Sequence, residues 1–198
     1  MEINDRYMDM LKDEYKLSYL LYKENNFRLQ NWSSHQLVLI HILNTITEGN
    51  VLEFGMGEHS THIMHLICGM QNRKLYSVEC DKEWASKYTH YEYVNHQITF
   101  YDGSDLMNKD NDFFHRKYAI AFIDGHPGEL RQPFIEAINA DYFIVHDTER
   151  ILSGKKPDSY NYDVSLFKHV IHCQLTIPMT SIFSNLDVIN KDILILNE

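Results

Sequence analysis

The chain contains 198 residues with 28 acidic and 18 basic side chains, which gives a formal net charge of −10 at pH 7. This acidic balance counts against a nucleic-acid backbone as the main partner, because phosphate binding needs concentrated Lys and Arg. Charged residues occur throughout residues 1–20 and no apolar run is long enough to cross a bilayer, so we expect neither a signal peptide nor a membrane partner.

The length predicts one domain over residues 1–198, with N-terminal helices in residues 1–48 and the main fold in residues 49–198. Cysteines Cys68, Cys80 and Cys173 are odd in number and lack CxxC spacing. This pattern argues against a disulfide framework or a zinc ribbon, and it predicts a reducing, cytoplasmic setting.

Two helices are expected before the first strand. Residues 5–25 repeat apolar side chains at steps of three and four, and the stripe of Tyr15, Tyr19 and Tyr22 predicts a core face or a homodimer face, with a ligand surface as the alternative. Ser33 or Ser34 then offers an N-cap for a second helix that runs to about residue 47.

Residues 51–60, VLEFGMGEHS, predict a buried strand, a glycine turn and the start of a helix. This layout is typical of a nucleotide-cofactor site, because glycines let the backbone approach a ligand and the helix N-terminus adds N–H donors. Glu53 lies inside the strand, and a second acid, Glu79, ends the next expected strand at residues 74–79.

A helix at residues 82–91 and a strand at residues 97–101 follow, and then Asp102-Gly103-Ser104. Open α/β sheets bind ligands at the carboxyl ends of their strands, so Asp102 is a candidate ligand contact; the alternative is an Asp-Gly turn without a ligand.

The second half of the chain predicts strands at residues 118–124 and 141–145 around a helix at residues 128–139. The first strand ends in Asp124-Gly125-His126-Pro127 and the second in His146-Asp147. Residues 148–162 form a long connection, which suggests a functional segment. We expect a helix at residues 163–172 and an antiparallel pair at residues 174–183 and 186–196.

Four segments together resemble the class I S-adenosylmethionine-dependent methyltransferases: LEFGMGEHST, LYSVECDKEW, FIDGHP and FIVHDTE. The resemblance is to the small O-methyltransferases that act on sugars and related hydroxyl compounds. It implies an α/β fold, a Rossmann-like three-layer sandwich whose seven-stranded, mostly parallel sheet carries an antiparallel C-terminal strand. It also implies that residues 49–198 are a catalytic core.

The resemblance assigns roles to residues at the strand ends. Glu79 is expected to hold the ribose hydroxyls of S-adenosylmethionine, and Asp102 the adenine. Ser34 and Gln36 are minor candidates for its methionine end. The full set of expected cofactor contacts is Ser34, Glu53, Gly55, Gly57, Ser60, Thr61, Glu79, Asp102, Gly103, Ser104 and Asp124.

Methylation of a hydroxyl requires removal of its proton, and the sequence leaves two routes open. His126 is the favoured general base, oriented by Asp124 or Asp147. Alternatively, Asp124 and Asp147 hold a divalent ion such as Mg²⁺. Metal-dependent relatives present a further acid or amide beside the second aspartate, whereas here His146 and Thr148 flank Asp147, so a metal is not favoured.

The expected acceptor is a sugar, a glycan or a related small molecule. A catalytically inactive cofactor-binding or partner module stays open as an alternative, and an NAD-dependent oxidoreductase is the other one, although Ser60 stands where a dinucleotide fingerprint places its third glycine. His59, His62 and His65 are not expected to form a metal site, because steps of three drift around a helix.

Overall fold

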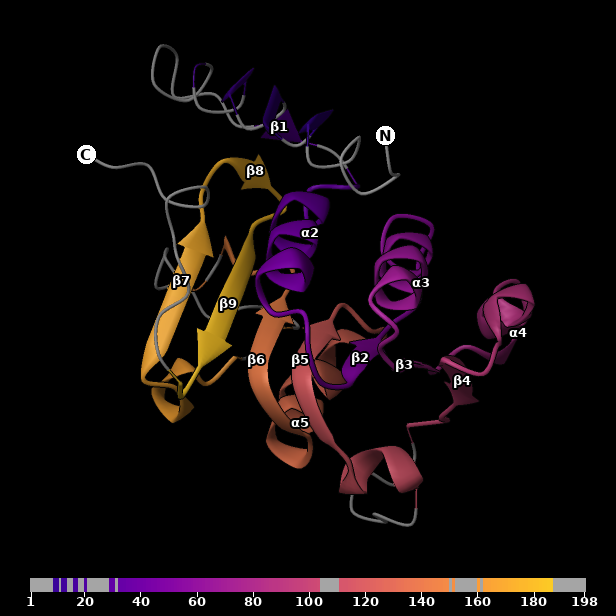
Figure 1. The fold of residues 1–198 in the computed structure, drawn as a ribbon. Helices are drawn as coiled ribbons and strands as arrows, with labels where there is room; N and C mark the ends of the chain where they lie inside the picture. The colour runs from indigo at the N-terminus through magenta and orange to yellow at the C-terminus, as the bar shows by residue number, and fades with distance from the viewer. Residues whose placement is uncertain are drawn as a thin grey trace.

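The computed structural model describes residues 9–10, 12–13, 16–17, 20, 29–30, 32–103, 111–149, 151, 160 and 162–186. A twisted sheet crosses the molecule, with helices on both of its faces (Figure 1). The described residues between 9 and 20 are helical, as expected, but the tyrosine stripe at Tyr15, Tyr19 and Tyr22 lies outside the described residues. In this part of the chain, no helix combines the length and apolar composition needed to cross a membrane.

The sheet contains seven strands in the order β4-β3-β2-β5-β6-β9-β7, and this confirms the expected architecture. Strands β2 to β6 run parallel, whereas β9 is antiparallel to both β6 and β7. The strands are β2 (Val51–Phe54), β3 (Leu75–Glu79), β4 (His96–Phe100), β5 (Lys117–Ile123), β6 (Asn139–Val145), β7 (His169–Cys173) and β9 (Thr180–Ser184). A separate short parallel pair joins β1 (Leu29–Gln30) to β8 (Thr176–Ile177).

Two apolar layers enclose the sheet. Helices α2 (Gln36–Thr45) and α3 (Thr61–Met70) pack on one face with Ile120, Phe122 and Ile144. Helix α5 (Arg131–Ala137) packs on the other face, where Phe134 stacks on Phe54. Strands β2 and β3 are buried along their whole length, which explains their nearly continuous apolar sequences. The remaining helical segments are α4 (Lys82–Ser86), η1 (Thr89–Tyr91), η2 (Asp112–His115), η3 (Gly128–Leu130) and η4 (Val164–Leu166).

The expected helix at residues 163–172 is wrong. Only η4 is helical there, and β7 begins at His169. Ile171 belongs to the apolar layer on one face of the sheet and Val170 packs against the layer on the other, which is the alternation of a strand. The expected strand at residues 174–183 is in part β9, and residues 187–198 lie outside the described residues.

The start of α2 also differs in detail from the expectation. Its N-cap is His35, whose side chain makes no capping hydrogen bond, rather than Ser33 or Ser34. Oγ of Ser34 is buried without a hydrogen-bond partner among the described residues. The carboxyl ends of β5 and β6 point toward this end of α2, at the top of Figure 1.

Candidate functional site

The turn after β2 is fixed by close packing at its first glycine. Gly55 has φ +91°, and a Cβ there would lie 2.4 Å from Cα of Gly125, at the end of β5. Position 55 therefore needs glycine for the fold itself. At Gly57 a Cβ would meet only Oγ of Ser60, at 3.5 Å. The protein leaves room at Gly57 that its own packing does not require.

The backbone N–H groups of this turn donate hydrogen bonds to other groups of the protein. The N–H of Gly55 bonds the carbonyl of Val78, and that of Gly57 bonds Oγ1 of Thr61 at 2.9 Å. The N–H of Met56 donates to Oε2 of Glu79 at 2.8 Å. The turn is thus held in shape from within, by the next strand and by the first residue of α3.

Glu79 is a buried carboxylate at the carboxyl end of β3. Besides Met56, the backbone N–H groups of Cys80 and Asp81 donate to its Oε1, at 2.7 and 2.9 Å. An ionised carboxylate offers about four lone-pair sites, so about one remains for a ligand hydroxyl. Contact with a ribose stays a prediction, and the carboxylate is already held in a fixed position.

Glu53 is fully buried beneath the start of α3. Ser60 and Thr61 donate hydroxyl hydrogen bonds to its Oε1 at 2.8 and 2.9 Å, and Ser77 donates to Oε2 at 2.5 Å. Burial raises the pKa of Glu53 to about 7, and the three hydroxyl groups oppose the shift. Glu53 therefore anchors Ser60 and Thr61, and direct contact of these three residues with a cofactor stays a prediction.

We call Glu53, Gly55, Gly57 and Glu79, with the residues that bond them, the glycine-turn site. Trp84 of α4 lies against it, because its indole Nε1 donates to the carbonyl of Met56 at 2.7 Å. Asp102 and Gly103 follow β4 at the same edge of the sheet. Burial raises the pKa of the Cys80 thiol most, and the charges of Glu79 and then Asp102 raise it further, so Asp102 lies near Cys80. Ser104 lies outside the described residues.

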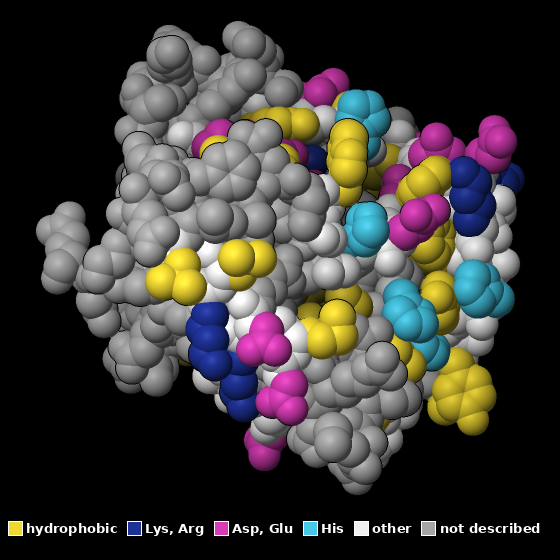
Figure 2. Space-filling model, turned by 90° about the horizontal axis from the view of Figure 1, so that it is seen from above, with side chains coloured by type: hydrophobic (Ala, Val, Ile, Leu, Met, Phe, Trp, Pro, Cys, Tyr) yellow, Lys and Arg dark blue, Asp and Glu magenta, His cyan; other side chains and the backbone are white. Residues whose placement is uncertain are grey.

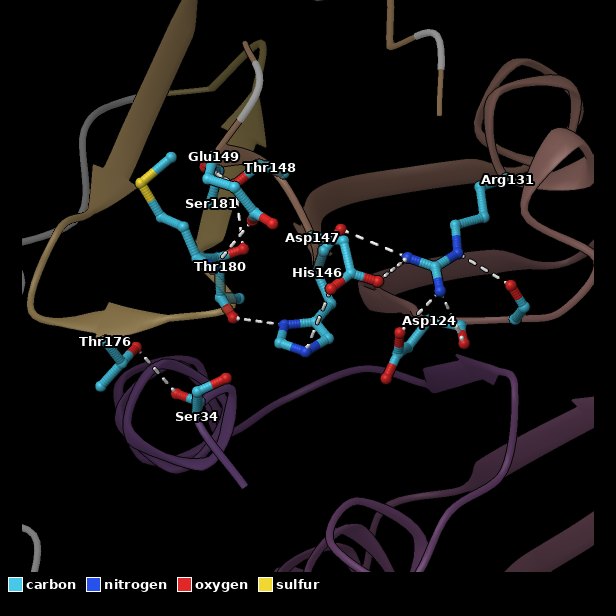
Figure 3. A network of polar contacts seen from close by, with 12 residues as sticks. Ser34, Asp124, Arg131, His146, Asp147, Thr148, Glu149, Thr176, Thr180 and Ser181 are labelled. Carbon is cyan, nitrogen blue, oxygen red and sulfur yellow. Dashed lines mark hydrogen bonds and ion pairs between the residues drawn. The ribbon is translucent and has the colours of Figure 1, made fainter. Parts of the chain in front are cut away.

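Asp124 and Asp147 meet at the neighbouring strand ends, and Arg131 joins them (Figure 3). Its guanidinium donates to Oδ1 of Asp124 at 2.9 Å and to Oδ2 of Asp147 at 3.0 Å. The arginine side chain is only 5% exposed, and it also donates to the carbonyl of Gly125 at 2.8 Å. We call Asp124, Arg131 and Asp147 the aspartate cluster.

The aspartate cluster places a fixed cation between the two carboxylates. This arrangement counts against Mg²⁺ bridging Asp124 and Asp147, because the guanidinium already bonds one oxygen of each carboxylate. Burial raises the pKa of Asp124 to about 7, although Arg131 pulls it down. Asp147 has φ +59°, an uncommon backbone conformation that directs its carboxylate toward Arg131.

His126 follows the carboxyl end of β5, and its side chain is exposed. Within the described ranges it makes no hydrogen bond to Asp124 or Asp147, both of which bond Arg131 instead. Its role as a base stays a prediction. Sequence reasoning missed Arg131, and the signal was available: it is the cation at the start of the helix that follows Asp124.

Two buried histidines lie beside the aspartate cluster. His35 precedes α2 and His146 follows β6, with ring centroids 4.9 Å apart. Burial lowers the pKa of both imidazoles to about 3. His146 lowers the pKa of His35 further, and the backbone of His59 raises it. Arg131 lowers the pKa of His146 further. Both imidazoles are therefore neutral at pH 7.

Hydrogen bonds tie the start of α2 to the glycine turn and to β8. Nε2 of Gln36 donates to the carbonyl of His59, next to the glycine turn, at 3.0 Å. Oγ1 of Thr176 donates to the carbonyl of Ser34 at 3.3 Å. Ser34 and Gln36 thus lie at this edge as expected, and their contact with a cofactor stays a prediction.

The histidines on α3 do not converge on one point. His62 contacts Tyr91 and His65 contacts His96, through Nδ1 atoms in both cases. Figure 2, which looks down from above Figure 1, shows histidine and acidic side chains spread over the described half of this surface. Among the described residues, the candidate metal-binding group is instead His35, Asp124 and His146.

Comparison with known proteins establishes the fold. The chain is similar to a candidate O-methyltransferase from Klebsiella pneumoniae, with 13% identity over 91% of this chain and 90% of that one, and a TM-score of 0.54. It is also similar to the 1,6-didemethyltoxoflavin-N1-methyltransferase of Burkholderia thailandensis, solved with S-adenosylhomocysteine, with 12% identity over 94% and 92% of the two chains and a TM-score of 0.45. A third match is the 16S rRNA methylase ArmA, with 11% identity over 78% and 83% and a TM-score of 0.46.

No protein-family model and no curated protein sequence matches the chain. The match to the Klebsiella pneumoniae structure, together with the strand order, confirms the expected methyltransferase-type α/β fold. Identities this low show the fold alone, so the chemistry depends on the residues of this chain.

Proposed function

We propose that this chain is an S-adenosylmethionine-dependent O-methyltransferase that methylates a hydroxyl group of a sugar, a glycan or a related small molecule. The observation that carries the proposal is the glycine-turn site. Its backbone is fixed by Glu53 and Glu79, and Gly57 leaves space that the protein does not fill.

The acids of the site suit the charge of the cofactor. S-adenosylmethionine carries a cationic sulfonium and an ammonium group, and Glu79 and Asp102 place carboxyl groups at the carboxyl ends of β3 and β4. Glu79 keeps an acceptor position for a ribose hydroxyl, and Asp102 lies at the next strand end for the adenine. The expected contacts at Gly55, Ser60, Thr61 and Gly103 lie along the same turn and edge, and Ser104 remains a proposed contact outside the described residues.

The acceptor is proposed to lie at the aspartate cluster. The ring of Tyr160 lies under Arg131, with 4.3 Å between the guanidinium carbon and the ring centroid, and Tyr162 stacks beside it. Aromatic rings of this kind pack well on the apolar faces of sugars. The cation of Arg131 orders both carboxylates at the place where a hydroxyl must lose its proton.

Cofactor binding provides the direct test. Calorimetric titration should show S-adenosylmethionine binding at about micromolar affinity, and Gly57→Ala should weaken it about tenfold, because a methyl group enters the ligand's space. Gly69→Ala is the matched control: its added Cβ meets nothing within 4 Å on α3, so affinity should not change. Equal binding by both variants, or binding of NAD in place of S-adenosylmethionine, would contradict the proposal.

Proton removal needs its own test, because His126 is the proposed base and the aspartates its proposed helpers. His126→Gln should lower kcat by about 10²–10⁴-fold while cofactor affinity is preserved. His115→Gln, at another exposed histidine, is the control and should keep full activity. A normal kcat in His126→Gln would remove His126 from the mechanism.

Acceptor class is tested by screening methyl transfer to sugars, catechols, peptides and RNA. Activity on sugars or other small hydroxyl compounds supports the proposal. Activity confined to RNA or peptides contradicts the acceptor assignment. Cofactor binding without transfer to any of them favours the inactive module.

A further inference from the structure

His35 is a buried polar side chain whose ring is unsatisfied. The residue is 4% exposed, and neither Nδ1 nor Nε2 makes a hydrogen bond of good geometry to a described residue, although the backbone of His59 lies near enough to raise the pKa of the ring. Native proteins pair nearly all buried polar groups, so an orphan of this kind needs an explanation. The ring packs between Phe122, with centroids 5.1 Å apart, and His146, which fixes its position.

The orphan ring faces two further potential ligands. One ring nitrogen of His35, one carboxylate oxygen of Asp124 and one ring nitrogen of His146 all lie within 4.8 Å of one another. They come from the start of α2, the end of β5 and the end of β6. Three separate elements therefore bring two imidazoles and one carboxylate to a single point.

His146 is already oriented as metal ligands are. Its Nδ1 lies 2.9 Å from Oγ1 of buried Thr180 (Figure 3). Metal-binding histidines typically use one nitrogen for such a bond, which fixes the ring and presents the other nitrogen to the metal. Nε2 of His146 points toward the aspartates, 3.7 Å from Oδ1 of Asp147.

We propose that His35, Asp124 and His146 bind a divalent first-row transition-metal ion of the Zn²⁺ type. Imidazole ligands favour Zn²⁺, Co²⁺ and Fe²⁺, whereas Mg²⁺ and Ca²⁺ prefer oxygen. This ligand set differs from the pair Asp124 and Asp147, whose carboxylates Arg131 joins.

Charge and access are compatible with this ion. The cluster sets two carboxyl groups against one guanidinium, and metal ligands bind with their imidazoles neutral and their carboxyl groups deprotonated. Arg131 engages Oδ1 of Asp124, and the second oxygen makes no hydrogen bond to a described residue. The Asp124 side chain is 25% exposed, which gives an ion a path from solvent. Zinc bonds of about 2.1 Å require the ligand atoms to approach by roughly 1 Å.

Three protein ligands leave a coordination position open for water or for a substrate oxygen. Binding of the ion alone does not depend on methyl transfer. Cofactor titration of chelator-treated protein tests the proposed function separately.

The test is titration of chelator-treated full-length protein with Co²⁺, followed by visible absorption and calorimetry. We expect one Co²⁺ per chain with micromolar or tighter affinity, displacement by Zn²⁺, and no competition from Mg²⁺. His35→Phe should weaken binding at least 100-fold while preserving the fold, because the ring fills the same space and no hydrogen bond is lost. Asp124→Asn, which keeps an oxygen for Arg131, should also weaken it and decides the matter if His35→Phe does not fold.

The control is the double variant His62→Ala/His90→Ala, which removes two exposed histidines near Tyr91 and should leave the tight site intact. Three results would overturn the proposal: no Co²⁺ binding, binding that survives both His35→Phe and Asp124→Asn, or binding abolished by the control variant.

Discussion

The glycine-turn site and the aspartate cluster lie at the same edge of the sheet but satisfy their acids in different ways. Among the described residues, the groups that donate hydrogen bonds to Glu53 and Glu79 are neutral, namely hydroxyl and backbone N–H groups. Asp124 and Asp147 share the guanidinium of Arg131. In the part of the chain that the structure describes, one half of the edge therefore has no cation bonded to its acids, and the other half has one cation for two acids.

This difference has a functional meaning under the proposed chemistry. An uncompensated acidic site attracts the cationic cofactor, whereas a protein cation there would repel it. The acceptor side has another task, because two nearby carboxylates repel each other without a cation between them. Arg131 lowers the pKa of Asp124 against the effect of burial, and it holds both carboxylates in place.

The strongest way to break this comparison is to remove the shared cation. Arg131→Met should lower the free energy of unfolding by about 3–5 kcal/mol, because two largely buried carboxylates lose their partner. Urea denaturation measures the loss. Arg116→Met is the control: Arg116 pairs with exposed Asp112 on the surface, so its loss should cost about 1 kcal/mol or less.

A triple variant separates charge from packing in that result. Adding Asp124→Asn and Asp147→Asn to Arg131→Met should restore much of the lost stability, because no buried charge is then unpaired. If the triple variant is no more stable than Arg131→Met, the arginine acts mainly through packing and its carbonyl contacts, and the contrast between the two halves fails.

The pH dependence of stability tests the glycine-turn half of the comparison. His96 lies behind Glu53: its Nε2 is 2.9 Å from Oγ of Ser77, and its Nδ1 is 3.0 Å from Nδ1 of His65. Burial, and then His65, lower the pKa of His96 to about 4. Between pH 6.5 and about pH 4, His96 is protonated in the unfolded chain but neutral in the folded chain. The free energy of unfolding therefore falls as the pH is lowered through this window.

His96→Gln should remove that part of the acid sensitivity. The free energy of unfolding of the wild type relative to the variant should fall by about 2–3 kcal/mol between pH 7 and pH 4.5, since one pH unit is worth about 1.4 kcal/mol per proton. His115→Gln, at an exposed histidine, should leave the pH dependence unchanged. Parallel curves for wild type and His96→Gln would show that His96 is not a neutral buried residue.

Sequence reasoning located the parts of this site that depend on strand order. The carboxyl ends of parallel strands meet at one edge, so the strand pattern predicts that Asp124 and Asp147 converge, and the family resemblance adds Glu79 and Asp102 to the same edge. The antiparallel β9 was also expected, but β7 was missed because the five residues HVIHC alternate too briefly to exclude a helix.

The partners of the acids could not be predicted in the same way. Glu53 was expected to face a ligand, yet its contacts with Ser60, Thr61 and Ser77 depend on how α3 and β3 sit on β2. His35 precedes a helix that was predicted, but nothing in the local sequence indicates that its ring meets His146 more than a hundred residues later. Such contacts depend on tertiary packing, which local patterns do not encode.

The smallest expected effect concerns the helix that braces the glycine-turn site. Asp81 caps α4 by accepting a hydrogen bond from the N–H of Trp84 at 2.9 Å, and the indole of Trp84 in turn holds the carbonyl of Met56. Asp81→Ala should lower stability by about 1 kcal/mol, the usual cost of losing such a cap.

Asp163→Ala is the matched control. Asp163 is also exposed, and it accepts a hydrogen bond from the N–H of Ser165 at the start of η4, away from the turn. Both variants should lose similar stability, but only Asp81→Ala should weaken S-adenosylmethionine binding, by a few fold in calorimetry, because only it loosens Trp84 over Met56. Equal cofactor affinity in the two variants would mean that the turn keeps its shape through Glu53 and Glu79 alone.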